Sequence, residues 1–325
     1  MPDDPVVHAL RSARLAMNAV DDGVTRSLGS RWLQLEAQLN GNIAALSNEM
    51  VRRREAGEVI TDAMVRRSER YKIMRAQLQN ETDKFNRDAL RDISDGQENA
   101  IRLGVSAAEN ALIVSLPKAG SFRKVNLKAI RKMIGIAGDG SPLMKLLKKS
   151  YGDALIGIMR ALLRGVSRGL GAEEVARLMV KGAGMGMDRA LVIARTELNR
   201  AYRMASTETY RESGVVEGWM RLVARDEACF SCLVLDGERF DSESEMDDHP
   251  NGRCTCVPIL IGMDAPQWDM AQDWFGNQSE ERQREIMGNA RYDMWKNGKP
   301  LSEFVHKAHS DTWGDSPALV PIGAM

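Results

Sequence analysis

All four cysteines of the 325-residue chain fall between positions 229 and 256, and one of its four histidines lies among them. They follow the pattern CxxC, sixteen residues, His, four residues and CxC. Thiolate and imidazole ligands favour zinc over magnesium or calcium, and a CxxC turn lets two sulfurs reach one ion. The spacing therefore predicts a structural zinc site, with one candidate more than a tetrahedral ion needs. The five candidate ligands are Cys229, Cys232, His249, Cys254 and Cys256.

The residues alone leave other roles open for these cysteines. Residues i and i+2 of a strand share a face, so strand geometry favours Cys256 as the partner of Cys254 in one site. A disulfide between the two halves of the cluster would suit a protein exposed outside a cell. A redox-active CxxC usually opens a helix, whereas Cys229 and Cys232 are expected in a loop that follows a strand. Buried cysteines without a ligand are the remaining alternative.

The rest of the chain offers no convincing catalytic set. His306 and His309 lie in the tail, far from any cysteine. The glycine run GAGMGM at 182–187 lacks the Lys-Ser/Thr ending of a phosphate-binding loop. A zinc ion with four protein ligands would leave no open position for a substrate. We therefore expect a protein that is not an enzyme.

Composition and charge favour a water-soluble globular protein. Lys plus Arg and Asp plus Glu each total 45, so the formal net charge is zero, which argues against a general nucleic-acid coat. The N-terminus lacks the uninterrupted apolar core of a signal peptide. The sequence contains no run of 18 or more apolar residues, so a membrane anchor is not expected. The cysteines are therefore interpreted for a reducing cytosol, and the length predicts two domains with a tail.

The N-terminal part predicts two long amphipathic helices. No proline lies between Pro5 and Pro117, and the first apolar stripe suits a helix of roughly 30 residues. Gly57 should end this helix and Thr61 should cap the next one. A short connection between two such helices predicts an antiparallel hairpin within the chain. The two stripes are Trp32, Leu35, Leu39, Ile43, Leu46 and Met50, and then Tyr71, Met74, Leu78, Phe85 and Ala89.

Residues 118–149 are strongly basic. They contain nine lysines or arginines and one acid, Asp139, and the sequence GDGSP at 138–142 predicts a hinge. Such a stretch is either a solvated helix face or a patch for an acidic partner, which would be DNA phosphates or an acidic protein surface. The candidate contact residues are Arg123, Lys124, Lys128, Arg131, Lys132, Lys145, Lys148 and Lys149.

From residue 151 the pattern predicts helices and a small sheet. A run without Gly or Pro over 187–213 follows the glycines and predicts a helix that ends at Gly214. Bulky and β-branched residues at 215–224 predict a strand, and 254–260 predicts a strand that returns beside it. The cysteine cluster would then lie between two strands of one sheet.

Three sequence segments around the cysteines follow a recognisable order. They are ARTELNRAYRMA at 194–205, RDEACFSCLVLDG at 225–237 and HPNGRCT at 249–255. This order resembles the C-terminal domain of the phage Mu F-like minor head proteins, the phage head morphogenesis family. That family has an ARTE-type helix, a DxxxCxxCxxLDG segment and an HPNGRC segment. Cys256 is an additional cysteine relative to this pattern, so the resemblance favours His249 as a ligand.

The resemblance implies a minor head protein in the virion of a tailed bacteriophage. Such proteins associate with the portal or the inner capsid and assist head assembly and DNA packaging or ejection. The implied partners are the portal protein, capsid or scaffold proteins and packaged DNA. The implied location is the inside of the head near the portal, after assembly in the host cytoplasm. The alternative is a zinc-ribbon module that binds nucleic acids, but the basic stretch lies far upstream of the cysteines.

Together these features predict a mostly α-helical α+β protein in four consecutive parts. These parts are a helical arm (1–117), a basic hinge region (118–150), the head-morphogenesis domain with its small sheet and Cys/His cluster (151–262) and a tail (263–325). The tail holds four of the six tryptophans, and Ser279 should cap a helix within it. Aromatic residues in a tail favour docking onto the parent domain, while a partner interface is the alternative.

Overall fold

The structure, a computed structural model, contains two units, and each is built from separate stretches of the chain. The sheet unit consists of Met1–Val20, Gln97–Ile134 and Thr196–Met325, and the hairpin unit consists of Asp21–Gly96 and Gly135–Arg195. The four consecutive parts expected from the sequence remain a prediction. The described residues are 4–116, 122–126, 128, 149, 152, 156–165, 168, 170, 172–225, 228–310 and 314–325.

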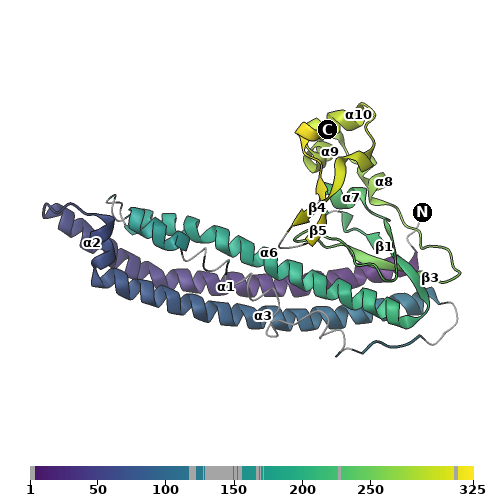
Figure 1. Cartoon of the computed structure of the whole chain (residues 1–325), viewed down its shortest axis with the longest axis horizontal. Coiled ribbons are helices and arrows are strands. Elements are labelled where there is room, and N and C mark those ends of the chain that lie inside the picture. Colours follow the sequence, from purple (N-terminus) through teal and green to yellow (C-terminus); the bar gives the residue numbers. More distant parts are fainter. Residues whose placement is uncertain are drawn as a thin grey trace. The chain divides into compact units, whose positions relative to one another are not determined.

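Two long helices form the expected antiparallel hairpin (Figure 1). They are α1 (Pro5–Glu55) and α3 (Glu69–Ser115), and the short α2 (Asp62–Arg67) lies between them in the chain. Trp32 packs edge-on against Phe85, with 5.6 Å between the ring centroids. The hairpin unit has one core that also includes part of the segment 156–165. The core residues are Leu46, Met50, Ile60, Val65, Tyr71, Met74, Leu78, Ile158, Leu162 and Leu163.

The predicted helix ends are confirmed, but α1 is longer than expected. Thr61 caps α2, because its side chain accepts a hydrogen bond from the Met64 amide at 3.3 Å. Gly57 has a φ of 87°, a backbone conformation that glycine adopts without strain. The helix α1 spans 51 residues because its first turns bury a further apolar stripe, which includes Leu10 and Met17.

The helix α6 (Ala172–Ser213) ends where the sequence predicted and begins earlier. Gly214, with a φ of 74°, follows its last residue. The expected start after the glycine run is wrong, since the helix continues through 182–187. Each helical glycine costs about 1 kcal/mol. Burial of the helix side chains beyond them, such as Leu198 and Tyr202, offsets that cost.

The main sheet has three antiparallel strands in the order β2-β1-β3. The strands β1 (Val216–Leu222) and β3 (Thr255–Leu260) match the two predicted strands. The short β2 (Arg239–Asp241) was not predicted. Trp219 of β1 is fully buried and stacks on Phe240 of β2, with 4.0 Å between the ring centroids. All six residues of β3 are buried, which places the cysteine that follows Thr255 inside the protein.

The tail packs against the segment that carries the cysteines. Phe275, Tyr292 and Phe304 share one core with Phe230 and with two of the cysteines. Ser279 caps the predicted helix by accepting from the Arg282 amide. The strands β4 and β5 pair as a hairpin that the sequence did not predict, and Trp313 lies outside the described residues. The tail elements are α8 (Ala271–Gly276), α9 (Glu280–Met287), α10 (Asn289–Lys296), the 3-10 helices Leu301–Phe304 and Ile322–Ala324, β4 (Val305–Ser310) and β5 (Gly314–Leu319).

The predicted fold class is confirmed: the protein is mostly α-helical, and its described residues form two small antiparallel sheets. Among the described helices, none is both long and apolar enough to cross a membrane.

Candidate metal centre

The CxxC pair opens a short helix, which corrects the expectation of a loop. Cys229 is the N-cap of α7 (Phe230–Val234), and Cys232 lies within that helix. The segment becomes helical because Phe230, Cys232 and Leu233 are buried together in the core shared with the tail. Docking of the tail was expected, but its packing against the CxxC segment was not, since the other half of this core lies in α8, α9 and α10.

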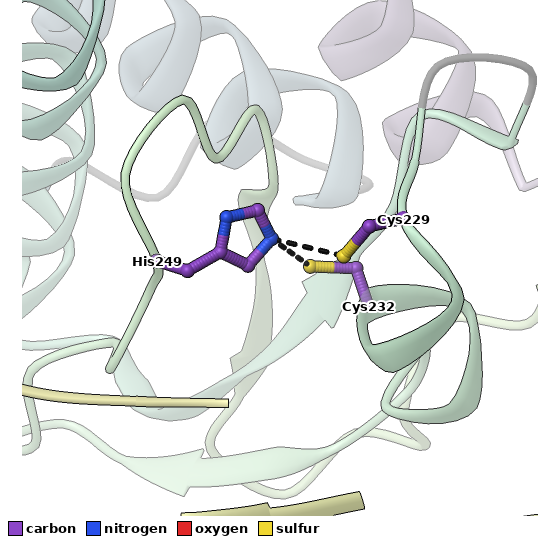
Figure 2. A group of neighbouring side chains, drawn as sticks. All are labelled: Cys229, Cys232 and His249. Carbon is purple, nitrogen blue, oxygen red and sulfur yellow. Dashed lines mark hydrogen bonds between the residues drawn. The ribbon is translucent and has the colours of Figure 1, made fainter. Parts of the chain in front are cut away.

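His249 lies opposite the CxxC pair, in the loop between β2 and β3 (Figure 2). Its Nε2 is 3.0 Å from Sγ of Cys229 and 3.1 Å from Sγ of Cys232. Its Nδ1 is 2.8 Å from the carbonyl oxygen of Pro250, to which it donates a hydrogen bond. A backbone acceptor at one ring nitrogen directs the other toward a metal ion. The ligand atoms of Cys229, Cys232 and His249 all lie within 4.8 Å of one another.

Cys254 is a further buried neighbour of Cys232. It precedes β3 by one residue, and its thiol is hydrogen-bonded to Cys232. A second group of candidate ligands consists of Cys232, Asp248 and Cys254. The Asp248 carboxylate forms a buried ion pair with Arg203 at 2.8 Å, which leaves the sulfurs and the imidazole as the better ligands. Cys232 therefore connects the Cys229–His249 pair with Cys254, and together these side chains could hold a metal ion.

Cys256 belongs to neither group of candidate ligands. It lies inside β3, where burial raises the pKa of its thiol to about 12. Its carbonyl oxygen accepts a hydrogen bond from the Tyr210 hydroxyl of α6 at 3.1 Å. Cys254 lies immediately before β3 and Cys256 lies inside it, and of the two only Cys254 belongs to a candidate ligand group.

Without a metal, the side chains of the cluster share protons: Cys229 is ionised, whereas Cys232 and His249 keep their protons near neutral pH. A hydrogen bond with Cys232 lowers the pKa of the Cys229 thiol to about 3, and His249 acts in the same direction. The hydrogen bond with Cys229 raises the pKa of His249 to about 9. Hydrogen bonds with Cys229 and Cys254 raise the pKa of Cys232 well above its usual value. Metals bind thiolates, so a metal ion would displace the remaining shared protons.

The helix α6 holds the loop that carries His249. Thr196 Oγ1 accepts a hydrogen bond from the Asn251 amide at 3.1 Å. Arg203 donates to the Gly252 carbonyl oxygen at 3.1 Å and pairs with Asp248. The ARTE helix was predicted from the sequence, but a role for these two side chains was not. Their signal was a pair of polar residues seven positions apart, which is the spacing of one helix face.

Asp236 fixes the end of the CxxC segment. Its carboxylate accepts from the backbone amides of Val223 at 2.9 Å and Ala271 at 2.8 Å, and from Trp268 Nε1 at 3.0 Å. Gly237 follows with a φ of 83°, so this turn needs a residue without a side chain. The LDG sequence therefore ties α7 to β1 and to the start of α8.

Four residues of the predicted basic patch are described, and all four are exposed. Arg123, Lys124 and Lys128 belong to the sheet unit, and Lys149 belongs to the hairpin unit. The others, Arg131, Lys132, Lys145 and Lys148, lie outside the described residues.

Comparisons of the chain with protein-family models, with curated proteins and with solved structures found no match. The function has to be inferred from the residues and their geometry.

Proposed function

We propose that the chain is a minor head protein of a tailed bacteriophage whose C-terminal domain contains a structural zinc site. The supporting observation is the convergence of the three motif segments on one cluster. The 194–205 segment holds the His249 loop through Arg203, and that loop faces the CxxC pair of 225–237. The three segments, which were recognised by their order in the sequence, thus contact one another around the cysteine cluster.

Zinc is the metal that these side chains suit best. Cys229, Cys232, His249 and Cys254 supply three sulfurs and one imidazole, a combination typical of structural zinc. A zinc ion would link α7, the loop after β2 and the start of β3, which burial alone holds weakly because the segment 238–253 is mostly half-buried or exposed. With four protein ligands, such a site stabilises the fold and leaves no position for a substrate. A non-enzymatic role follows.

The partners belong to the same proposal. A minor head protein would contact the portal protein inside the head, with capsid or scaffold proteins and packaged DNA nearby. The exposed residues Arg123, Lys124 and Lys128 offer positive charge for an acidic portal surface or for DNA phosphates. Arg203 and Arg221, which lie near the cysteines, form ion pairs within the fold instead. Arg221 is buried and pairs with Glu238 at 3.1 Å, which argues against a zinc-ribbon module that reads nucleic acid at this cluster.

Co-sedimentation with portal rings tests the proposal. The reduced full-length chain should sediment with rings of the portal protein from the genome that encodes it, and rising salt should release it. Replacing Arg123, Lys124 and Lys128 by glutamate should weaken this binding.

A triple replacement of Arg66, Arg67 and Arg75 by glutamate is the matched control, since these exposed arginines lie in the hairpin unit and outside the basic stretch. It should bind portal rings like the unchanged chain. If the chain does not bind portal rings but binds duplex DNA through the segment that carries the cysteines, the zinc-ribbon alternative would be supported instead.

A further inference from the structure

A pocket lies within the sheet unit, and none of the candidate metal ligands lines it. It has a volume of about 400 Å³. The first turns of α1 contribute one wall, with Arg11, Arg14 and Asn18. Residues after β1 and before β3 contribute Arg225 and Arg253, and Trp274 of α8 completes the lining. We call it the arginine pocket.

The lining of the arginine pocket is positive. Four arginines line it, and the described lining residues include no Asp or Glu. Three of these arginines have other contacts. Arg225 pairs with the Asp269 carboxylate at 3.1 Å, and Arg11 and Arg253 also interact elsewhere in the chain.

Arg14 is different, because its guanidinium is buried without a hydrogen-bond partner. Its exposed fraction is 6%. None of its three side-chain nitrogens has a hydrogen-bond partner in the described part of the chain. Burial lowers the pKa of Arg14 to about 10, and the nearby charge of Arg203 acts in the same direction.

Two other buried arginines each pair with a carboxylate, which Arg14 does not do in the described part of the chain. Arg203 has the Asp248 carboxylate at 2.8 Å, and Arg221 has the Glu238 carboxylate at 3.1 Å. A buried charge without a partner is costly, so proteins rarely keep one unless a ligand supplies the opposite charge. Arg14 therefore has no hydrogen-bonded anion in the described part of the chain, and the nearby charge of Cys254 acts on it without such a bond.

We propose that the arginine pocket binds a phosphate group, with Arg14 at its base. Guanidinium groups match the oxygens of phosphate in fork geometry and carry their charge at every physiological pH. The volume falls within the range of small-ligand pockets, about 300–1,000 Å³. The phosphate could come from a free phosphorylated small molecule or from the end of a DNA strand. This inference goes beyond the proposed function and does not depend on it.

Isothermal titration of the full-length chain with pyrophosphate tests the site. Pyrophosphate should bind with a Kd below about 1 mM. Sulfate should compete, because it presents the same oxygen geometry. Parallel titrations with a deoxynucleoside monophosphate and with an oligonucleotide, with and without a 5′-phosphate, identify the source. Failure of all these probes to bind overturns the proposal.

Arg14→Met separates a ligand role from a structural one. The variant should weaken pyrophosphate binding by at least about tenfold, while the ligand-free chain should melt at the same temperature or higher, because an unpaired buried charge is gone. Arg14→Lys keeps the charge and should retain part of the binding. Arg67→Met removes an exposed arginine from the hairpin unit and should change neither property.

Two outcomes would contradict the role of Arg14. One is binding that Arg14→Met leaves intact. The other is a lower melting temperature of the ligand-free variant, which would mark Arg14 as part of the fold. Asp226 and Glu227 follow Arg225 in the sequence and lie outside the described residues. The proposal would also be overturned if phosphate bound only to the double variant Asp226→Asn, Glu227→Gln. In that case, the pocket of the unchanged chain would bind its own carboxylates and not a phosphate.

Discussion

The imidazole of His249 is oriented by a single backbone contact. Nδ1 donates to the Pro250 carbonyl oxygen, which leaves Nε2 facing the sulfurs of Cys229 and Cys232. The proline that follows His249 cannot donate a backbone hydrogen bond, yet its carbonyl supplies the acceptor that the ring needs. The HP pair is therefore one functional unit.

The choice between His249 and Cys256 gives the prediction at this scale. Reduced protein with zinc should carry about one zinc ion per chain. His249→Gln should lose most of it, because the remaining sulfurs leave the tetrahedral set incomplete. Cys256→Ala should keep the full content, since Cys256 belongs to no ligand group. Elemental analysis after gel filtration measures both. Zinc lost from Cys256→Ala and kept by His249→Gln would reverse the assignment.

Asp236 allows a second test at the residue scale. Asp236→Asn places an amide NH₂ where the carboxylate accepts three hydrogen bonds, so at least one buried donor loses its acceptor. We expect a loss of about 1–3 kcal/mol in the free energy of unfolding, measured by urea titration. Asp264→Asn makes the same charge change at an exposed position and should have little effect. Equal stability of the two variants would contradict the role given to Asp236.

The candidate ligands could be predicted from the sequence, but which of them lie together could not. CxxC spacing and the HPNGRC segment named every residue of the cluster. His249 joins Cys229 and Cys232 because the loop between β2 and β3 brings its Nε2 to their sulfurs, and no local sequence pattern encodes that loop conformation. Thr196 and Arg203 were missed for a related reason, because their partners lie in a loop about 50 positions away and no local pattern encodes such a pairing.

Contact between α3 and α6 within the sheet unit depends on one small residue. A side chain on Gly104 would meet the Tyr202 carbonyl oxygen and, at 2.9 Å, the Ala205 Cβ. Ser206 Oγ donates a hydrogen bond to the Gly104 carbonyl oxygen at 3.1 Å. The two helices must pack closely for this short side chain to reach the backbone of α3. The helix α6, which carries the ARTE segment, therefore packs closely against α3 at Gly104.

Replacement of Gly104 should show this dependence. Gly104→Ala should lower the free energy of unfolding by about 1–3 kcal/mol, because the added methyl group overpacks the contact. Gly23→Ala is the matched control, since nothing lies within 4 Å of an added Cβ there. That change should instead raise stability by about 0.5–1 kcal/mol through helix propensity. The contact would be refuted if both alanines stabilised the protein alike.

At the level of elements, long periodic patterns were the most predictable. The hairpin of α1 and α3, the Thr61 cap and strands β1 and β3 follow from apolar spacing and turn residues. The start of α6 did not, because packing offset the cost of its glycines. The hairpin of β4 and β5 has mostly exposed or half-buried residues, so no alternating apolar pattern announced it.

The whole molecule joins distant stretches into two units. The sheet unit combines Met1–Val20 with Gln97–Ile134 and Thr196–Met325, so it takes the start of α1 and the end of α3. The bounds of these two units could not be predicted from the sequence, because the long helices that contribute to both units carry no break at the boundary. The zinc proposal makes a claim on this scale: the metal should order the cysteine segment and leave the hairpin unit unchanged.

Hydrogen exchange of the reduced protein, with zinc and after chelation, tests this claim most directly. A four-ligand zinc site can contribute about 10–16 kcal/mol of apparent binding energy. We expect removal of zinc to speed exchange throughout 229–256 and to leave residues 69–96 of α3 unchanged, because that stretch has its own core in the hairpin unit. Equal protection of 229–256 with and without zinc would contradict the account.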